Sequence, residues 1–162
     1  MSFFGKRLSE YVALAKPFLG LVLVVGIARL ALSLGGVSNS TTTWLSITAV
    51  GWIGILYYAI RVHTSGFGSY KQLLPIFVLV NLTGQAIIVL GIIIAIFTGT
   101  DNIFSAPEYS FGGDGKTWGH VAAHLFLGTT TGSLVAWLVG SAIMFVTKKL
   151  TAGNAAKAAA HA

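Results

Sequence analysis

The chain of 162 residues is 55% hydrophobic and only 9% charged, and it carries a net charge of +6 at pH 7 with no cysteine. Soluble domains contain about 25% charged residues, so this composition excludes a soluble globular fold. The absence of cysteine excludes disulfides, thiolate metal ligands and cysteine nucleophiles. The basic residues flank apolar runs and form no patch, which indicates membrane-orientation signals and argues against nucleic-acid binding.

In chain order, a mixed basic segment comes first and four apolar runs follow. Residues 1–16 predict either a short helix at the membrane interface or a frayed basic tail. A bilayer is spanned by about 17–25 apolar residues, and each of the four runs reaches that length. These predicted spans are 17–34, 44–62, 75–98 and 118–147.

The distribution of charge predicts the orientation of the spans. Of the ten Lys and Arg residues, all but Arg29 and Lys116 lie on the side that contains both termini. Cationic loops stay in the cytoplasm. We therefore expect an all-α, four-helix transmembrane bundle with both termini inside, in a bacterial-type inner (cytoplasmic) membrane. The short loop 99–117 would lie on the outer face, and 148–162 would form an Ala-rich cytoplasmic tail.

Arg29 is the residue that a span tolerates least. It lies twelve positions after Pro17, about 18 Å into a core of about 30 Å. A charged side chain at that depth costs at least ~2.5 kcal/mol. We expect Arg29 to face the bundle interior. There it would contribute to an anion site or a polar pathway, or it would form one half of a structural pair.

His120 and His124 lie one helical turn apart at the start of the fourth run, so they share a helix face. This spacing can present two imidazoles to a divalent metal ion or one imidazole to a haem iron. Hydrogen bonding to the loop or to lipid headgroups is the alternative. With Arg29 and Thr48, which should lie at similar depth, the histidines predict an outward-facing polar pocket covered by the 99–117 loop.

Two further patterns concern contacts between helices. Asn81 and Gln85 lie one turn apart in the third run, where buried amides must find hydrogen-bond partners. We interpret them as interhelical polar contacts, with a ligand or proton path as the alternative. The fourth run also has a small residue at every fourth position, which lets helices approach closely. The members of this small-residue seam are Gly128, Gly132, Ala136 and Gly140.

Two classes of function agree with these features. The small size and the seam favour a non-catalytic subunit that packs against a membrane-protein partner or a second copy in a larger complex. The alternative is a ligand-, ion- or haem/metal-binding protein, including a small transporter, built around the Arg/His pocket. No arrangement of catalytic residues is recognisable, so we expect no enzyme. The expected partners are the lipid bilayer and another membrane protein, not nucleic acid.

Overall fold

The computed structural model describes residues 1–110 and 112–160, with side chains up to Ala152. Its N-terminal segment is a hairpin of two short strands, β1 (Ser2–Phe3) and β2 (Lys6–Arg7), which pair antiparallel. The two residues between the strands have positive φ angles of 49° and 81°. Two-residue hairpin turns favour this geometry. Part of the predicted mixed segment 1–16 is thus a hairpin, and the rest is helical.

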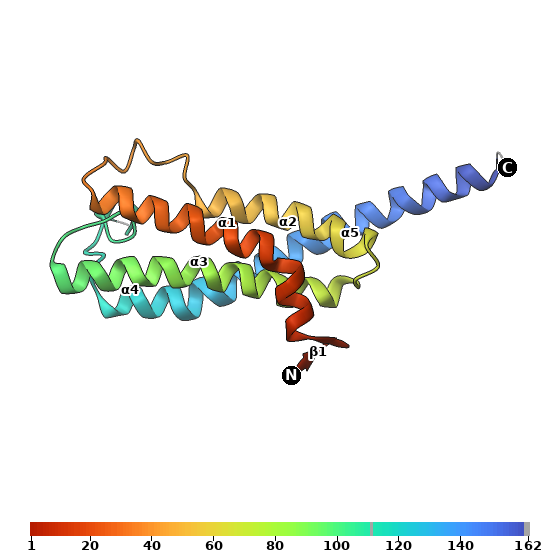
Figure 1. Cartoon of the computed structure of the whole chain (residues 1–162), viewed down its shortest axis with the longest axis horizontal. Helices are drawn as coiled ribbons and strands as arrows, with labels where there is room; N and C mark the ends of the chain where they lie inside the picture. Colours follow the sequence, from red (N-terminus) through yellow and green to blue (C-terminus); the bar gives the residue numbers. More distant parts are fainter. Residues whose placement is uncertain (111, 161–162) are drawn as a thin grey trace.

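Helix α1 (Leu8–Leu34) begins nine residues before the predicted span. Its start is stabilised by Glu10, whose carboxylate accepts the Arg7 backbone N–H at 2.7 Å. Pro17 lies inside the helix and has no N–H to donate to the turn before it, which bends a helix. Figure 1 shows the bend in the N-terminal part of α1.

Helices α2 (Ile47–Thr64) and α3 (Tyr70–Thr98) follow. Helix α2 starts later than the predicted run at 44, because the Ser46 hydroxyl caps it by accepting the Ala49 N–H at 3.2 Å. Helix α3 starts before the predicted run at 75, because Gln72 completes a capping box with the residue that precedes the helix. Pro75 is therefore inside α3 rather than at its start.

The fourth predicted run is one continuous helical rod. It consists of α4 (Trp118–Ala122), a π-helical segment η2 (Ala123–Gly128) and α5 (Thr129–Ala160). Its start at Trp118 agrees with the prediction. The helix does not end at residue 147 but continues through most of the predicted tail, and residues 161–162 lie outside the described part of the chain.

The long helices run along a common axis (Figure 1), and α3 packs against α1, α2 and α5. Three helices are long and apolar enough to cross a membrane: Leu8–Leu34, Tyr70–Thr98 and Trp118–Ala152. Large apolar side chains such as Val24 and Leu138 remain exposed on their outer faces, at 67% and 60%. Such apolar surface is suited to lipid. The prediction of a helical protein whose helices are long and apolar enough to cross a membrane is confirmed for these three helices.

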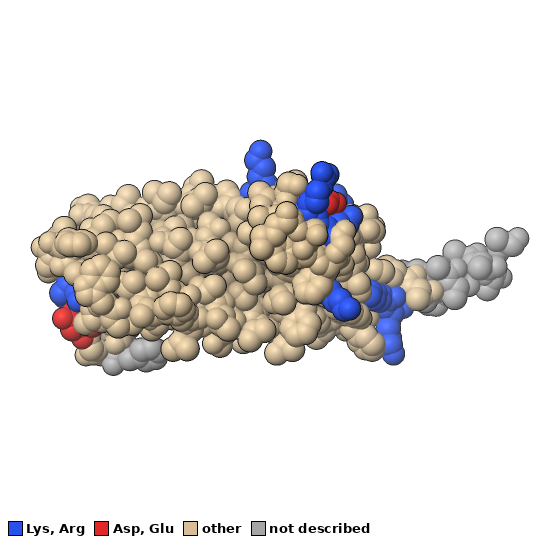
Figure 2. All heavy atoms as spheres, turned by 90° about the horizontal axis from the view of Figure 1, so that it is seen from below, with Lys and Arg blue, Asp and Glu red and all other residues tan. Residues whose placement is uncertain are grey.

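Charge separates the two ends of the bundle. Figure 2 shows Lys and Arg gathered toward one end, whereas the opposite end carries a small cationic area beside acidic residues. By the alternation of the helices, the first of these ends holds the start of α1, the end of α2 and the start of α3. We call it the basic end. The opposite end, where the 99–117 loop lies, is called the loop end.

The 99–117 loop is fastened to the helices and contains one short 3-10 turn, η1 (Pro107–Tyr109). Asn102 is 1% exposed and donates its amide to the Gly91 carbonyl at 2.7 Å. The Ile103 N–H donates to the Ser33 hydroxyl at 2.8 Å. These bonds tie the loop to α3 and to α1, so it forms a packed cover over the loop end.

Candidate functional site

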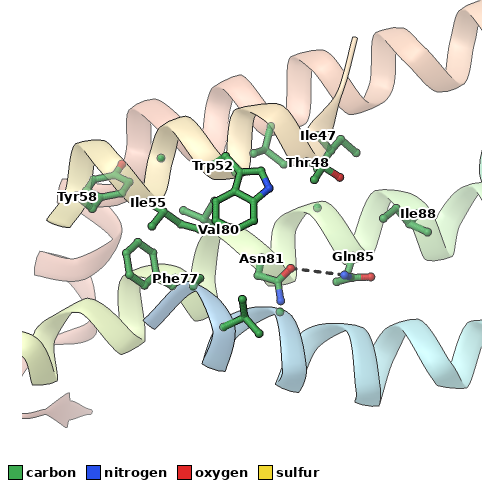
Figure 3. Close-up of a pocket in the computed structure, with 17 residues that line it drawn as sticks. Ile47, Thr48, Trp52, Ile55, Tyr58, Phe77, Val80, Asn81, Gln85 and Ile88 are labelled. Atoms are coloured by element: carbon green, nitrogen blue, oxygen red, sulfur yellow. Dashed lines mark hydrogen bonds between the residues drawn. The ribbon is translucent and has the colours of Figure 1, made fainter. Parts of the chain in front are cut away.

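A cavity of about 310 Å³ lies between the helices (Figure 3). Most of its lining is apolar, and the side chains with polar groups are Thr48, Trp52, Tyr58, Asn81 and Gln85. The lining residues, contributed by α1, α2, α3 and α5, are Val22, Ile47, Thr48, Gly51, Trp52, Gly54, Ile55, Tyr58, Phe77, Val80, Asn81, Gly84, Gln85, Ile88, Gly132, Val135 and Ala136. Trp52 and Val135 are about half exposed. The cavity therefore reaches the apolar outer surface of the helices.

Glycines on neighbouring helices create this space in two ways. A Cβ atom added at Gly84 would lie 2.9 Å from Ile47, and one added at Gly54 would lie 3.0 Å from Phe18. These two glycines let the helices approach. Gly51 differs, since a Cβ atom there would meet no heavy atom within 4 Å. Gly51 borders empty space in the cavity.

On the α5 side, the amide of Asn81 closes the cavity. Its nitrogen, which carries two hydrogens, donates to the carbonyls of Gly128 and Thr129 at 3.1 and 2.9 Å and lies 3.2 Å from the Ser133 hydroxyl oxygen. Both carbonyls lie where the π-helical segment passes into α5, and hydrogen-bond partners shift at such a transition. Asn81 therefore satisfies backbone groups at the π-to-α transition, and this fixes the orientation of its amide.

The orientation of Asn81 in turn sets that of Gln85. Because the Asn81 nitrogen faces carbonyls, its oxygen faces Gln85, whose amide nitrogen approaches it at 3.5 Å. The Gln85 oxygen then points to His124, where it lies 2.7 Å from Nδ1. An amide oxygen only accepts hydrogen bonds, so His124 Nδ1 must donate.

The two histidines form a directed pair. His120 Nδ1 lies 2.8 Å from the carbonyl oxygen of Gly115, so it is also a donor. The two Nε2 atoms face each other at 3.1 Å. With both Nδ1 atoms protonated, neutral rings direct two lone pairs into one space. A proton or another cation between the two Nε2 atoms would relieve the repulsion between these lone pairs.

The structure brings together only part of the predicted pocket. His120 and His124 are in contact, and Gln85 links them to the cavity that Thr48 lines. Arg29 is half-buried elsewhere, with its guanidinium carbon 5.9 Å from the centre of the Tyr109 ring. Its Nε atom is buried, and no residue in the described part of the chain accepts its hydrogen bond. Arg29 is not part of the cavity lining.

The small-residue seam faces α3. A Cβ atom added at Gly132 would lie 2.7 Å from the Asn81 nitrogen, and one at Gly140 would lie 2.6 Å from the Phe77 ring. At Gly128 the added atom would lie 3.0 Å from the Gln85 amide. The seam thus lets the amides of α3 reach the backbone of the neighbouring helix.

The ionic groups of the loop end lie in the 99–117 loop. Lys116 Nζ contacts Asp101 and Asp114 at 2.7 and 3.3 Å. The hydrogen bond to Asp101 is the main cause that raises the pKa of Lys116, and the Lys116 backbone N–H is the main cause that lowers the pKa of Asp114. A 3.0 Å hydrogen bond from the Asn39 amide lowers the pKa of Glu108. The carboxyl groups of Asp114 and Glu108 are therefore ionised at neutral pH.

The described residues contain no cluster of three or more His, Asp or Glu side chains arranged around a metal ion. A haem iron with two axial histidines would need nitrogens about 4 Å apart on opposite sides of the ring plane. The 3.1 Å separation of the two Nε2 atoms on one helical rod does not fit that arrangement.

Sequence reasoning missed two groups at this site. Trp52 lies one turn after Thr48 on α2, and this spacing was a usable signal for a shared face. The Gly115 carbonyl, which orients His120, had no signal in the sequence, because any residue supplies a carbonyl. Compared with family models, with curated proteins and with solved structures, the chain matches none of them.

Proposed function

We propose that this chain is an integral membrane protein of four spans that binds a small, largely apolar molecule between its helices. The fourth span would be α2, whose exposed face carries Ile53, Leu56 and Ile60 and which packs against α1, α3 and α5. The cations at the basic end support an orientation with both termini in the cytoplasm. A bacterial-type inner membrane is the location for which that rule is best established.

The observation that carries the binding function is the cavity. Its volume of about 310 Å³ falls within the range of ligand pockets, about 300–1,000 Å³. A cavity of about 150 Å³ already accepts benzene. The space therefore suits a molecule of one or two rings, or a branched hydrocarbon segment.

The lining also indicates which polar group such a molecule would carry. The hydroxyl of Thr48, the indole N–H of Trp52 and the amide of Gln85 are donors on the cavity wall. A ligand with a carbonyl or a similar acceptor would be matched to them. Because the rim at Trp52 and Val135 is half exposed on the apolar surface, the ligand would enter from the bilayer.

Gly51 and Gly20 provide a matched pair of variants for testing this function. A Cβ atom at either residue meets nothing within 4 Å, but Gly51 lines the cavity and Gly20 is exposed on α1. The wild type, Gly51→Leu and Gly20→Leu are purified in detergent and extracted with organic solvent. Mass spectrometry should find one apolar compound in the wild type and in Gly20→Leu, and should find it depleted in Gly51→Leu. Equal retention by Gly51→Leu, or no bound compound in the wild type, would contradict the proposal.

A subunit that packs through the small-residue seam receives less support. The seam residues lie against Gln85, Asn81 and Phe77 of α3. A partner could use this surface only after α3 and α5 had separated, which would leave the Asn81 and Gln85 amides without their partners in an apolar region. Such groups are costly there. Ligand binding in the cavity needs no such rearrangement.

A further inference from the structure

We propose that His120 and His124 bind one divalent transition-metal ion through their Nε2 atoms. This site is separate from the cavity ligand, although Gln85 touches both. The inference goes beyond the proposed function and rests on three features of the pair: the anchoring of the outer ring nitrogens, the separation of the inner ones and the relative placement of the rings.

The outer ring nitrogens are anchored as in metal-binding histidines. A histidine that binds a metal usually donates its other N–H to a carbonyl or a carboxylate, which fixes the tautomer and the ring orientation. Here His120 Nδ1 is held by the Gly115 carbonyl at 2.8 Å, and His124 Nδ1 by the Gln85 oxygen at 2.7 Å. Both rings therefore present an Nε2 lone pair.

The separation of these lone-pair atoms fits a shared ion. Two metal–nitrogen bonds of about 2.05 Å place their nitrogens about 2.9 Å apart at a right angle and about 3.3 Å apart at the tetrahedral angle. The observed separation of 3.1 Å lies between these values. An ion can therefore be placed in bonding distance of both histidines without moving either ring.

The placement of the rings favours a metal ion over a proton. Each Nε2 atom lies about 1.2 Å from the centre of its own ring. For the observed separation of the two Nε2 atoms, a straight N–H···N bond would put the ring centres about 5.5 Å apart. Two rings that both bind one metal ion would put the ring centres about 4.9 Å apart. The observed distance between ring centres is 4.8 Å. The rings thus converge on a point beside the line that joins the two nitrogens.

The local backbone and the nearby charges are compatible with this site. His124 lies in the π-helical segment, and such segments occur frequently at functional sites. The nearest cation along the chain, Lys116, is already paired with Asp101 and Asp114. Water or a small molecule would complete the coordination, because the described residues supply no cluster of three or more metal-ligating side chains.

The type of ligand predicts which ions bind. Imidazole suits Cu²⁺, Ni²⁺ and Zn²⁺, whereas Mg²⁺ and Ca²⁺ prefer oxygen ligands. Among the first three, Cu²⁺ should bind most tightly. Isothermal titration of the detergent-purified, chelator-treated protein with each chloride salt should therefore give one Cu²⁺ or Zn²⁺ per chain and no heat from Mg²⁺ or Ca²⁺. The affinity tag must contain no histidine.

Two variants and one control test the assignment. His124→Ala should weaken Zn²⁺ binding at least tenfold, and Gln85→Leu, which removes the anchor of His124, should weaken it by about 10–100-fold. His63→Ala is the control, since its ring contacts Thr151 near the basic end, and it should bind as the wild type does. Wild-type affinity in His124→Ala, or no metal bound by the wild type, would overturn the proposal.

A measurement on the wild type avoids any doubt about the folding of the variants. Electron paramagnetic resonance of the Cu²⁺-loaded protein should show hyperfine coupling to two imidazole nitrogens. Coupling to fewer than two would overturn the assignment. So would nitrogen NMR spectra in which a proton bridges the two Nε2 atoms and is not displaced by added Zn²⁺.

Discussion

The Tyr58 hydroxyl contacts backbone carbonyls at the bend in α1, and removing this hydroxyl should lower the free energy of unfolding by a measurable amount. The Tyr58 side chain is fully buried, and its Oη donates toward the carbonyls of Ala15 and Leu14 at 3.1 and 3.2 Å. These carbonyls lie in the turn before Pro17, where a proline disturbs the helical bonding. Tyr58→Phe would keep the ring in place and leave those carbonyls without the hydroxyl.

The expected loss is that of one hydrogen bond, because a single proton is shared between the two carbonyls. Intramolecular hydrogen bonds contribute about 0.5–1.5 kcal/mol net, and interhelical ones in membrane proteins average about 0.6 kcal/mol with a maximum of about 1.7. We therefore expect Tyr58→Phe to lower the free energy of unfolding by about 1 kcal/mol, which is about a fivefold change in the equilibrium constant.

The neighbouring residue supplies the control. Tyr57 is 42% exposed, so Tyr57→Phe should leave the free energy of unfolding nearly unchanged. Both variants and the wild type are unfolded in mixed micelles with increasing mole fractions of SDS and followed by far-UV circular dichroism. Equal stability of the two variants would refute the inference that the Tyr58 hydroxyl stabilises the bend.

Three further predictions concern the seam and the loop. Gly132→Leu would place side-chain atoms on an α3 amide 2.7 Å away and should lower the free energy of unfolding by about 1–3 kcal/mol, whereas Gly20→Leu should not. Asn102→Ala, which removes the 2.7 Å bond to α3, should make the 99–117 loop sensitive to added protease. The pKa of Glu108 is lower in the folded protein than in the unfolded chain. The ionised Glu108 carboxylate therefore stabilises the fold above its unfolded pKa of about 4.3, and this stabilisation is lost as pH falls through the folded pKa. The protection factors of the loop amides, which are corrected for the intrinsic slowing of exchange at lower pH, should therefore decrease on acidification through that range, and Asn39→Ala should reduce this decrease.

Three of the four predicted apolar runs form helices long and apolar enough to cross a membrane, because hydropathy is a local property. The runs 17–34, 75–98 and 118–147 lie within the three helices that are long and apolar enough to cross a membrane. Their ends were harder to predict, because caps and helix extensions involve polar residues outside the apolar run. Helix α1 begins at Leu8 because Glu10 caps it, and α5 continues to Ala160.

The predicted Arg/His pocket shows which contacts cannot be inferred from the sequence alone. Arg29, Thr48 and the histidines were grouped by their depth in the membrane, and depth follows from residue number alone. Whether two residues at one depth meet depends on how each helix is rotated about its axis and on which helices are neighbours. Arg29 lies beside Tyr109, whereas Gln85, which the sequence assigns to an interhelical contact or to a ligand or proton path, contacts His124.

The sequence by itself determined which apolar helices are long enough to cross a membrane, the charge difference between the two ends and the presence of a seam and two histidines on one helix face. These properties depend on composition and on helical spacing. Only the tertiary structure decided that the seam is occupied by α3, that a cavity remains beside Gly51, and that Gly115 and Gln85 orient the histidine pair. Such contacts join residues distant in sequence, and they are set by helix rotation, close approach at glycines and the path of the loop.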